Sequence, residues 1–479
     1  MVHRSSSQEL ASLLAREIEA LPSGTSISTH RELVRRFGVS ATTVSQALAI
    51  ITQQGLITSR PGAGTYRTEV RPVTRAGDTS WQEAALELSN HIGSPTSTPR
   101  GFKTPGLLHA LSPSGPDVAD LNGGYLHPSL QPLKALGTAL ARAARRAESW
   151  DRPPVGGMPE LRDWFAADIG GGLGRHDILV CSAGQSALAT ALRALGQPGD
   201  PVIIESPTYP GTIAAAQAAG LRMIPIPLDG DGLRTDYFEQ ALVRTGARIV
   251  VIQPLFQNPT GASLTTSRQQ EILAIARRHA AFVVEDDFAR HMAHPDAGPV
   301  PPPMIADDPD GTVVHIRSLT KVTSPNLRVG ALAARGPVMA RLRSAHVVET
   351  MFVPAPLQYT ALEVVTAPGW KRSLATLGSA LAHRREVAVT AVTATFGPHA
   401  LAVRPRGAYH LWVSLPGHLD SRQFEAAALA HGVALTPGEN FYPTTGGSAP
   451  HVRLSYVAAP SAAEVDDAVR RLARLVAEE

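Results

Sequence analysis

Short, mainly apolar runs separated by alanine-rich helical stretches constrain the fold of this chain more than any other feature. The runs lie at residues 202–204, 223–226, 249–252, 282–284, 313–316 and 332–334. They are continuous rather than alternating, which is typical of strands buried on both faces of a sheet. Because helical patterns separate them, they predict an α/β fold with a mostly parallel sheet that is covered by helices.

Length and composition set the outer limits. A chain of 479 residues is too long for one ordinary domain, so two or three are expected. The formal net charge of +3 does not by itself indicate a nucleic-acid or membrane partner. Cys181 is the only cysteine, which excludes an intramolecular disulfide framework and fits a reducing compartment. The first residues lack the apolar core of a signal peptide, and no apolar run reaches the ~18 residues of a membrane span. We therefore expect a soluble cytoplasmic protein without a membrane partner.

Composition also divides the chain into three regions. Residues 1–68 carry compact helical patterns and a short hairpin. Residues 69–117 are rich in Pro, Ser and Gly, most clearly at 93–100, and are predicted to be a linker. One short helix at 81–88 is expected to interrupt this linker. Residues 118–479 contain the alternating strands and helices of the main domain.

The first region has the pattern of a helix-turn-helix. A first amphipathic helix begins near Ser7. A second begins at the capping box 29–32 and ends near Gly38. Ser40 then caps a third helix, which runs to Gly55. Two short helices joined by so tight a connection predict a helix-turn-helix.

A hairpin follows, and the order of these elements resembles a known family. Segments 56–59 and 65–68 flank a glycine-rich tip, as in a wing. Together with Glu-Leu-Val-x-x-Phe-Gly-Val-Ser-x-x-Thr-Val at 32–44, they resemble the winged helix-turn-helix of the GntR-type regulators. The resemblance implies binding to double-stranded DNA, with the third helix in the major groove and the wing on the backbone or minor groove.

The candidate DNA contacts are basic residues that face phosphate, the wing tip, and polar residues of the third helix. They are Arg31, Arg35, Arg36, Arg60, Gly62, Arg67, Thr42, Thr43 and Gln46. Base readout depends on the last three, because Ala41 replaces the arginine that the family usually has after Ser40. The alternative is a three-helix domain that does not bind DNA. It stays open because residues 1–70 carry seven arginines against five glutamates, a net charge of only +2.

Lys321 is one of only four lysines among the 44 lysines and arginines of the chain. Arginine does not lose its proton in a protein, whereas lysine can lose it and then attack an aldehyde. Lys321 ends the segment 318–321 after the run 313–316, and Arg328 follows seven positions later. An amine that forms a Schiff base, beside an arginine that holds a phosphate, predicts a site for pyridoxal phosphate (PLP).

Other segments suit the same cofactor, although each alone has an ordinary structural explanation. The strand, turn and helix at 180–188 can bind phosphate through backbone amides. Tyr209 can stack on a flat ring, and the amide of Asn258 can bind a ligand hydroxyl. An acid at 286–287 ends an apolar strand and can keep a pyridine nitrogen protonated. Arg453, within a strand pattern, suits a bidentate clamp on a carboxylate.

The order of these features resembles the fold-type I aminotransferases of class I over residues 118–479. The resemblance implies phosphate contacts from Ser182, Gly184, Gln185, Ser318 and Arg328, and stacking by Tyr209. It implies that Asn258 binds the ring hydroxyl, that Asp286 binds the ring nitrogen and that Lys321 is the Schiff-base lysine. Arg453 would bind the carboxylate of a substrate or effector. Asp287 stays an alternative to Asp286, and Phe288 replaces a tyrosine that usually donates to the ring hydroxyl.

A GntR-like reader, a linker of about 50 residues and an aminotransferase-like domain together resemble the MocR subfamily of bacterial regulators. This implies a homodimer whose DNA binding responds to PLP, an amino acid or another amine. One alternative is a working aminotransferase with an appended DNA-binding module, and Phe288 argues mildly against it. Another is a regulator with a dead PLP site, and Lys321 argues against that. His291 and His294 have a spacing that suits a metal but are interpreted as surface or packing residues, so no metal site is predicted.

Overall fold

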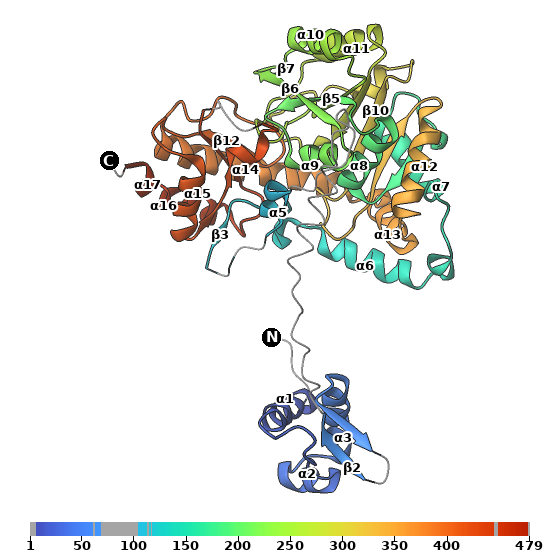
Figure 1. The fold of residues 1–479 in the computed structure, drawn as a ribbon, viewed down its shortest axis with the longest axis vertical. Helices are drawn as coiled ribbons and strands as arrows, with labels where there is room; N and C mark the ends of the chain where they lie inside the picture. Colours follow the sequence, from blue (N-terminus) through green and yellow to red (C-terminus); the bar gives the residue numbers. More distant parts are fainter. Residues whose placement is uncertain are drawn as a thin grey trace. The chain divides into compact units, whose positions relative to one another are not determined.

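The computed structural model describes residues 6–60, 63–68, 104–112, 115, 117–444 and 449–477. Contacts divide the chain into two compact units, Met1–Ile92 and Gly93–Glu479 (Figure 1). Within the described ranges, no helix combines the length and apolarity that a membrane span requires. The short helix predicted at 81–88 and the wing-tip residue Gly62 lie outside the described residues.

The N-terminal unit is a three-helix domain with a two-stranded hairpin, as predicted. Its elements are α1 (Ser6–Glu19), α2 (His30–Phe37), α3 (Ala41–Gln53), β1 (Ile57–Arg60) and β2 (Gly64–Arg67). The helices pack around a small apolar core that includes Leu14, Leu33, Val44 and Ile51. The two strands pair antiparallel with Ile57 opposite Arg67. Two of these helices, α2 and α3, also have side-chain caps at their N-termini.

Those caps use the residues that the sequence predicts. The hydroxyl of Thr29 accepts the N–H of Glu32, and the Glu32 carboxylate accepts the N–H of Thr29 at 2.7 Å. Gly38 ends α2 with a φ of 63°, in the left-handed region that favours glycine. Ser40 Oγ then accepts the N–H of Thr43 at 3.1 Å. The tight turn between α2 and α3 therefore follows from local chemistry.

The C-terminal unit is built on a mixed sheet of eight strands in the order β4-β11-β10-β9-β8-β5-β6-β7. The strands are β4 (Ile178–Cys181), β5 (Pro201–Ser206), β6 (Arg222–Asp229), β7 (Gly232–Leu233), β8 (Ile249–Ile252), β9 (Phe282–Asp287), β10 (Val313–Ser318) and β11 (Gly330–Ala334). Pairing is parallel from β10 through β9, β8 and β5 to β6. Strands β11 and β7 run antiparallel to their neighbours. The predicted α/β fold is confirmed.

Helices cover both faces of this sheet, which is why its strands are apolar on both sides (Figure 1). One face is covered by α8 (Ala183–Leu195), α9 (Pro210–Ala218) and α12 (Val338–Thr350). The other is covered by α7 (Pro159–Ile169), α10 (Thr235–Thr245), α11 (Thr266–Arg278) and α13 (Ala355–Thr366), and α6 (Leu133–Ala144) packs on α13. The sheet edge that bears the strand ends is left for the site.

A smaller C-terminal layer completes this unit. It comprises α14 (Trp370–Phe396), α15 (Ser421–Ala430), α16 (Ala462–Arg471), α17 (Ala473–Ala477) and a three-stranded sheet of β12 (His410–Ser414), β15 (His451–Ser455) and β14 (Thr436–Pro437). Strand β13 (Val433–Ala434) pairs in parallel with β3 (Ala119–Asp120). This pairing joins the start of the unit to its end and carries the segment after β3 toward the site.

Helix α5 (Pro105–Leu111) lies within the predicted linker but is a packed element. It contacts α9, β14 and the short 3₁₀ helix Gly438–Phe441 (Figure 1). A Cβ at Gly106 would lie 2.9 Å from Asn440 Cβ, so glycine is required for this close approach. The linker prediction is therefore wrong for 105–111, because the short helix buries one side against the C-terminal unit. The other predicted domain boundaries stay predictions.

Candidate functional site

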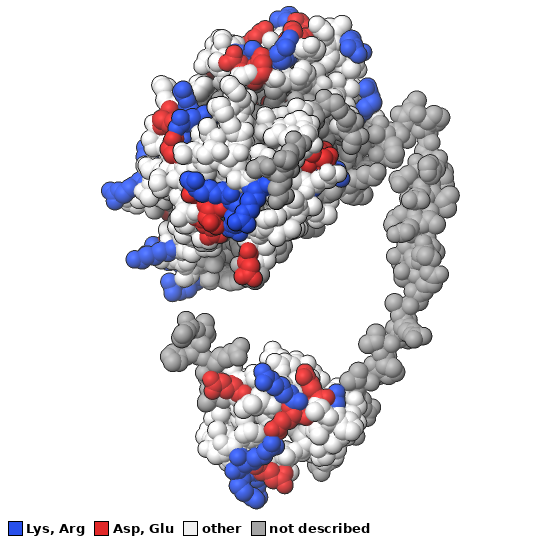
Figure 2. Space-filling view, turned by 90° about the vertical axis from the view of Figure 1, so that its left-hand side faces the viewer, with Lys and Arg blue, Asp and Glu red and all other residues white. Residues whose placement is uncertain are grey.

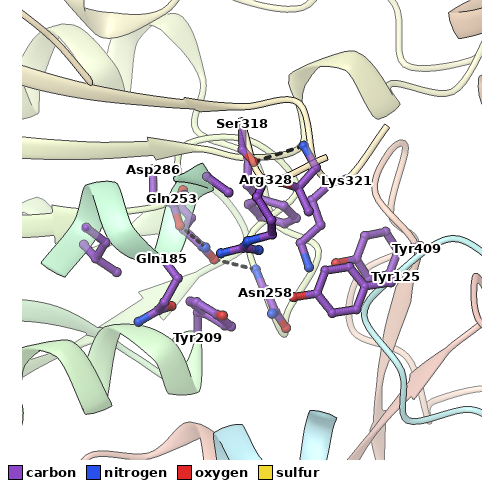
Figure 3. A pocket seen from close by; sticks show the side chains of 15 residues that line it. Tyr125, Gln185, Tyr209, Gln253, Asn258, Asp286, Ser318, Lys321, Arg328 and Tyr409 are labelled. Carbon is purple, nitrogen blue, oxygen red and sulfur yellow. Dashed lines mark hydrogen bonds between the residues drawn. The ribbon is translucent and has the colours of Figure 1, made fainter. Parts of the chain in front are cut away.

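A pocket lies at the carboxyl ends of the parallel strands, with about 550 Å³ of empty space when the solvent at its mouth is included (Figure 3). Its wall comes mainly from residues at or just after the ends of β4, β5, β8, β9 and β10, where open α/β sheets place ligands. The lining residues are Tyr125, Ala183, Gly184, Gln185, Leu188, Tyr209, Gln253, Asn258, Asp286, Phe288, Ser318, Thr320, Lys321, Arg328 and Tyr409. All predicted cofactor residues except Ser182 are therefore brought together.

Lys321 extends from the turn after β10 into this pocket. Its Nζ donates a hydrogen bond of 2.8 Å to the carbonyl of Gly124 and lies 4.0 Å from the ring centre of Tyr125. Removal from water and the positive charge of Arg453 lower the pKa of Lys321 to about 7, against an opposing effect of Asp286. A substantial fraction of the amine is therefore neutral near pH 7, as attack on an aldehyde requires.

The neighbouring acids at the end of β9 face opposite sides of the strand, because successive side chains alternate. Asp286 lines the pocket, and burial raises its pKa to about 6. Asp287 is fully buried on the other side, where Arg317 Nη1 lies 3.1 Å from its Oδ2 and Arg290 also pairs with it. Burial opposes ionisation of Asp287, but these two arginines outweigh it and hold its pKa below the usual range. A ligand in the pocket can thus reach Asp286 and not Asp287.

Gln253 organises the polar side of the pocket (Figure 3). Its Oε1 accepts the N–H of Asn258 at 3.0 Å, which directs its Nε2 to Asp286 Oδ2 at 2.7 Å. Its own N–H donates to Glu205 at 3.2 Å, and burial raises the pKa of Glu205 to about 8. One amide therefore connects the residue proposed for the ring hydroxyl with the residue proposed for the ring nitrogen.

The start of α8 forms the end of the pocket that suits a phosphate. Ser182 makes no side-chain capping bond there, so the first N–H groups of the helix are open to an anion. Ser318, Thr320 and Arg328 line the same pocket. Ser182 does not line the pocket. The backbone turns back at Ala183, with a φ of 68°, and the Ser182 carbonyl instead accepts Arg328 Nη2 at 3.1 Å.

The remaining groups of this wall fit a phosphorylated aromatic ligand. The buried Oγ1 of Thr320 has no protein partner among the described residues, although buried hydroxyls are usually hydrogen-bonded. A Cβ at Gly211 would lie 2.2 Å from the ring of Tyr209 and from Gln185 Oε1, so glycine lets both side chains approach. Hydrogen-bond donors, a cation, an aromatic ring and an acid thus line one pocket, and these are the groups that the two halves of PLP require.

Arg453 stands behind Asn258 rather than in the pocket wall. It lies in β15 and is only 3% exposed. Its Nη1 donates to Asn258 Oδ1 at 3.3 Å, and its Nη2 donates to the carbonyl of Asn122 at 2.6 Å. Its guanidinium also lies 5.2 Å from the ring centre of Phe441. Its role as a carboxylate clamp stays a prediction.

Sequence reasoning missed four polar residues of the pocket: Tyr125, Gln253, Thr320 and Tyr409. Two of them had a signal, because Gln253 directly follows a predicted strand and Thr320 precedes Lys321. Tyr125 and Tyr409 come from segments outside the main sheet and had none. Phe288, which lacks the expected hydroxyl, contacts Tyr409 edge to face with ring centres 6.5 Å apart.

A buried group of metal-ligand types was also not predicted. Ligand atoms of Glu285, Asp287 and His315 lie within 4.8 Å of one another. His315 Nδ1 is 2.7 Å from Glu285 Oε2, and Asp287 is paired with arginines, so protein groups already satisfy much of this cluster. His291 and His294, whose spacing suits a metal, form hydrogen bonds with different partners.

The second candidate site is the outer surface of α2 and α3 in the N-terminal unit. Arg31, Arg35, Thr42 and Gln46 are exposed there. Arg36 is exposed as well, but its Nη2 is 2.7 Å from a carboxylate oxygen of Glu17. Basic and acidic side chains are intermixed on the face of this unit that Figure 2 shows. On this face, attraction to phosphate would therefore come from individual basic side chains rather than from one uniformly basic surface.

Two predicted DNA contacts also have structural roles or partial burial. Thr43 is half-buried, and its hydroxyl lies 2.8 Å from Ser40 Oγ, so it takes part in the cap of α3. Arg67 is half-buried in β2. The side chain of Arg60 lies outside the described residues. A residue that sequence reasoning missed, His30, lies 3.0 Å from the carbonyl of Ala41 and joins α2 to α3.

Fold and site together define an aminotransferase-like domain joined to a winged helix-turn-helix. The chain belongs to the aminotransferase class I and II family, which matches residues 121–472. Residues 7–66 match the gntR family of bacterial regulatory proteins. This combination is that of the MocR subfamily of regulators.

Relatives share either the whole architecture or the second domain. The uncharacterized HTH-type transcriptional regulator YdfD of Bacillus subtilis is 26% identical over 91% of this chain and 88% of its own. The regulator YdcR of Escherichia coli, also uncharacterized, is 26% identical over 91% of both chains. Among solved structures, LysN of Thermus thermophilus, an α-aminoadipate aminotransferase complexed with N-(5'-phosphopyridoxyl)-L-leucine, has a TM-score of 0.73. It is 26% identical and covers 83% of this chain and 98% of its own.

The cofactor of this domain is PLP. When bound, PLP supplies an aldehyde and a ring that accepts electrons. In this pocket, Arg328, Ser318, Thr320 and the start of α8 would hold the phosphate, and Asp286 would face the ring nitrogen. Lys321 would hold the aldehyde carbon.

Proposed function

We propose that this chain is a DNA-binding transcriptional regulator whose aminotransferase-like domain holds PLP and responds to PLP, an amino acid or another amine. The observation that carries the proposal is a pocket with the groups PLP needs around Lys321, in a chain that also has a winged helix-turn-helix. Matches to HTH-type regulators over nine-tenths of the chain support it.

The pocket supports sensing more than turnover. Phe288 provides no hydroxyl for the ring hydroxyl, whereas Lys321 has the lowered pKa that covalent attachment needs. An incoming amine needs only to displace Lys321, but transamination also needs the freed lysine to move a proton on a correctly held substrate. The site therefore fits exchange of one amine for another more simply than a full catalytic cycle.

The rival function is a working aminotransferase with an appended DNA-binding module. A relative in Thermus thermophilus, 2-aminoadipate transaminase, is 27% identical over 75% of this chain. The test is to purify the protein with PLP and record its visible absorbance while amines are added. We expect amine-dependent spectral changes and altered DNA binding with slow or absent keto-acid formation. Turnover of about 1 s⁻¹ or faster with any amino donor and keto acid would favour the enzyme.

A homodimer belongs to the proposal. Large apolar side chains are exposed on α6, at Leu133 and Leu140, and at the end of α12, at Val347 and Val348. Exposed apolar surface of this kind is typical of protein interfaces. Two copies would also present two helix-turn-helix domains to two half-sites. Sedimentation equilibrium of the PLP-loaded protein tests this, with a monomer as the contrary result.

A further inference from the structure

Arg453 is held by two residues that lie on the side away from the pocket. Its Nη2 donates to the carbonyl of Asn122 at 2.6 Å and to Thr436 Oγ1 at 3.2 Å. On the pocket side, its Nη1 makes the longer bond of 3.3 Å to Asn258. The guanidinium therefore connects the pocket with the segment after β3 and with β14.

Asn122 continues this connection to α5. Its side-chain Nδ2 donates to the carbonyl of His109 in α5 at 2.8 Å. Its Oδ1 accepts the hydroxyl of Thr436, the same hydroxyl that accepts Arg453 Nη2. His109 is held a second time, because its Nε2 lies 3.0 Å from the carbonyl of Leu435. A continuous chain of hydrogen bonds thus runs from Arg453 to α5.

Packing supplies a second connection between the same parts. Helix α5 approaches Asn440 closely at Gly106, and the next residue, Phe441, lies under the guanidinium of Arg453. The carbonyl of Phe441 accepts the N–H of Thr208, which precedes the pocket residue Tyr209. The docking surface of α5 therefore includes Asn122 and adjoins Phe441, two residues that contact Arg453.

A carboxylate at Arg453 must disturb this arrangement. A bidentate grip pairs Nη2 with either Nη1 or Nε, because only these pairs present parallel N–H groups. Both acceptors on the far side, Asn122 and Thr436, depend on Nη2. Carboxylate binding therefore removes the hydrogen bond from Nη2 to Asn122 or the one from Nη2 to Thr436. Either loss weakens the hold on Asn122, whose side chain bonds to Thr436 and to the carbonyl of His109 in α5.

We propose that Asn122 is a positioning residue that couples carboxylate binding at Arg453 to the docking of α5, so that an occupied site loosens this helix. The inference rests on the proposed function and names the step that follows effector binding. Helix α5 directly follows residues 69–103, which connect it to the DNA-binding unit. Release of α5 from its docking surface would therefore be the change in the C-terminal unit that lies nearest in sequence to this connecting segment.

The test is a double-mutant cycle read by hydrogen exchange of the α5 amides in the full-length, PLP-loaded protein. The variants are Arg453→Lys, Asn122→Ala and the double variant. Asn122→Ala keeps the backbone carbonyl that Arg453 uses and removes the side-chain bonds to the carbonyl of His109 and to the hydroxyl of Thr436. Asn258→Ala is the matched control, since Asn258 also contacts Arg453 but does not reach α5. Thr436→Val gives a second way to break the link if Asn122→Ala folds poorly.

We expect Arg453→Lys to raise α5 exchange about fivefold or more, as the loss of one hydrogen bond would. In the Asn122→Ala background the same change adds little, and Asn258→Ala leaves α5 within about twofold of wild type. Independent, multiplying effects, an unchanged α5 in Arg453→Lys, or equal loosening by Asn258→Ala would overturn the coupling.

A second arm separates this inference from the proposed function. Each of the twenty common amino acids is added while the visible absorbance of the cofactor is recorded. If none changes it, and PLP and simple amines also leave DNA binding unchanged, the sensing function fails while the exchange cycle still decides the coupling. An amino acid that changes the absorbance must loosen α5 in wild type and not further in Asn122→Ala.

Discussion

The side-chain amide of Gln253 donates a 2.7 Å hydrogen bond to Oδ2 of Asp286. The N–H of Asn258 holds the amide in this orientation at 3.0 Å. Because the bond is made to a carboxylate oxygen, it favours the ionised form of Asp286 against the burial that raises its pKa to about 6. Gln253 thereby helps to keep a negative charge where a protonated ring nitrogen would lie.

Replacing Gln253 by leucine should weaken PLP binding by about tenfold, because the pKa of Asp286 then rises further and a charge-assisted bond is lost. Titration of the apoprotein with PLP, followed by visible absorbance, measures the effect. Gln269→Leu is a matched control, since Gln269 is equally buried but lies in α11 outside the pocket. Equal affinities for wild type and Gln253→Leu would remove Gln253 from the site.

Replacing Asp286 by asparagine should affect mainly the binding of PLP, whereas replacing Asp287 by asparagine should affect mainly the stability of the fold. Asp286→Asn should lower PLP retention and leave the apoprotein about as stable as wild type. Asp287→Asn leaves Arg317 and Arg290 without their buried partner and should cost about 3 kcal/mol of unfolding free energy. Denaturant unfolding and PLP titration separate the two effects. A greater loss of PLP from Asp287→Asn would reverse the assignment.

The contribution of Lys321 to the stability of the apoprotein should increase as pH rises from about 7, the pKa of folded Lys321, to 10.5, its ordinary value. In that window the unfolded chain keeps the proton on Lys321 and the folded chain does not, so unfolding takes up a proton. The difference in unfolding free energy between wild type and Lys321→Met should therefore grow in favour of wild type across the window. A difference independent of pH would contradict the lowered pKa.

Lys321 should also be where borohydride fixes PLP. The yield of fixed cofactor after brief mixing should rise with a midpoint near pH 7, because attack needs the neutral amine. Lys321→Arg, which keeps the charge but cannot lose its proton, should give no product. Peptide mass spectrometry identifies the modified residue, and label on Lys103, Lys134 or Lys371 would show that the assignment is wrong.

In the DNA-binding unit, Arg31→Ala should weaken binding to all sequences and reduce the salt slope by about one unit. Arg36→Ala should reduce it less, because Arg36 already pairs with Glu17. Gln46→Ala should change sequence preference more than bulk affinity. Fluorescence anisotropy at several salt concentrations measures all three. Unchanged DNA binding after deletion of residues 1–70 would exclude this unit as the reader.

Phe288→Tyr should lower the pH at which the absorbance of bound PLP titrates by about one unit, because a phenol can donate to the ionised ring hydroxyl. Phe288 lines the pocket, so the substitution adds a hydroxyl to a residue of its wall. Phe288→Leu adds no donor and should leave the midpoint nearly unchanged. A Phe288→Tyr midpoint equal to that of wild type would mean that the ring hydroxyl lies beyond its reach.

Much of this protein was predictable from neighbouring residues. Local dihedral preferences determine the capping box at Thr29 and the left-handed conformation of Gly38. The apolar strand runs follow from burial. Both kinds of signal can be read from a short segment of sequence. Lys321 and Arg328 were also visible, because their chemistry and spacing are local. The fold class and most of the polar residues that line the pocket could therefore be predicted from the sequence alone.

Tertiary packing decided the rest. Tyr125 and Tyr409 reach Lys321 only because β3 pairs with β13 and the C-terminal layer folds against the sheet. Helix α5 was hidden in a composition typical of linkers, since its stability comes from contacts with Asn440 and Asn122 rather than from its own sequence. Sequence determines which elements and reactive groups exist. The packing of the elements decides which distant groups come into contact. Contacts between remote segments produce no periodic pattern in the sequence, so the sequence alone does not reveal them.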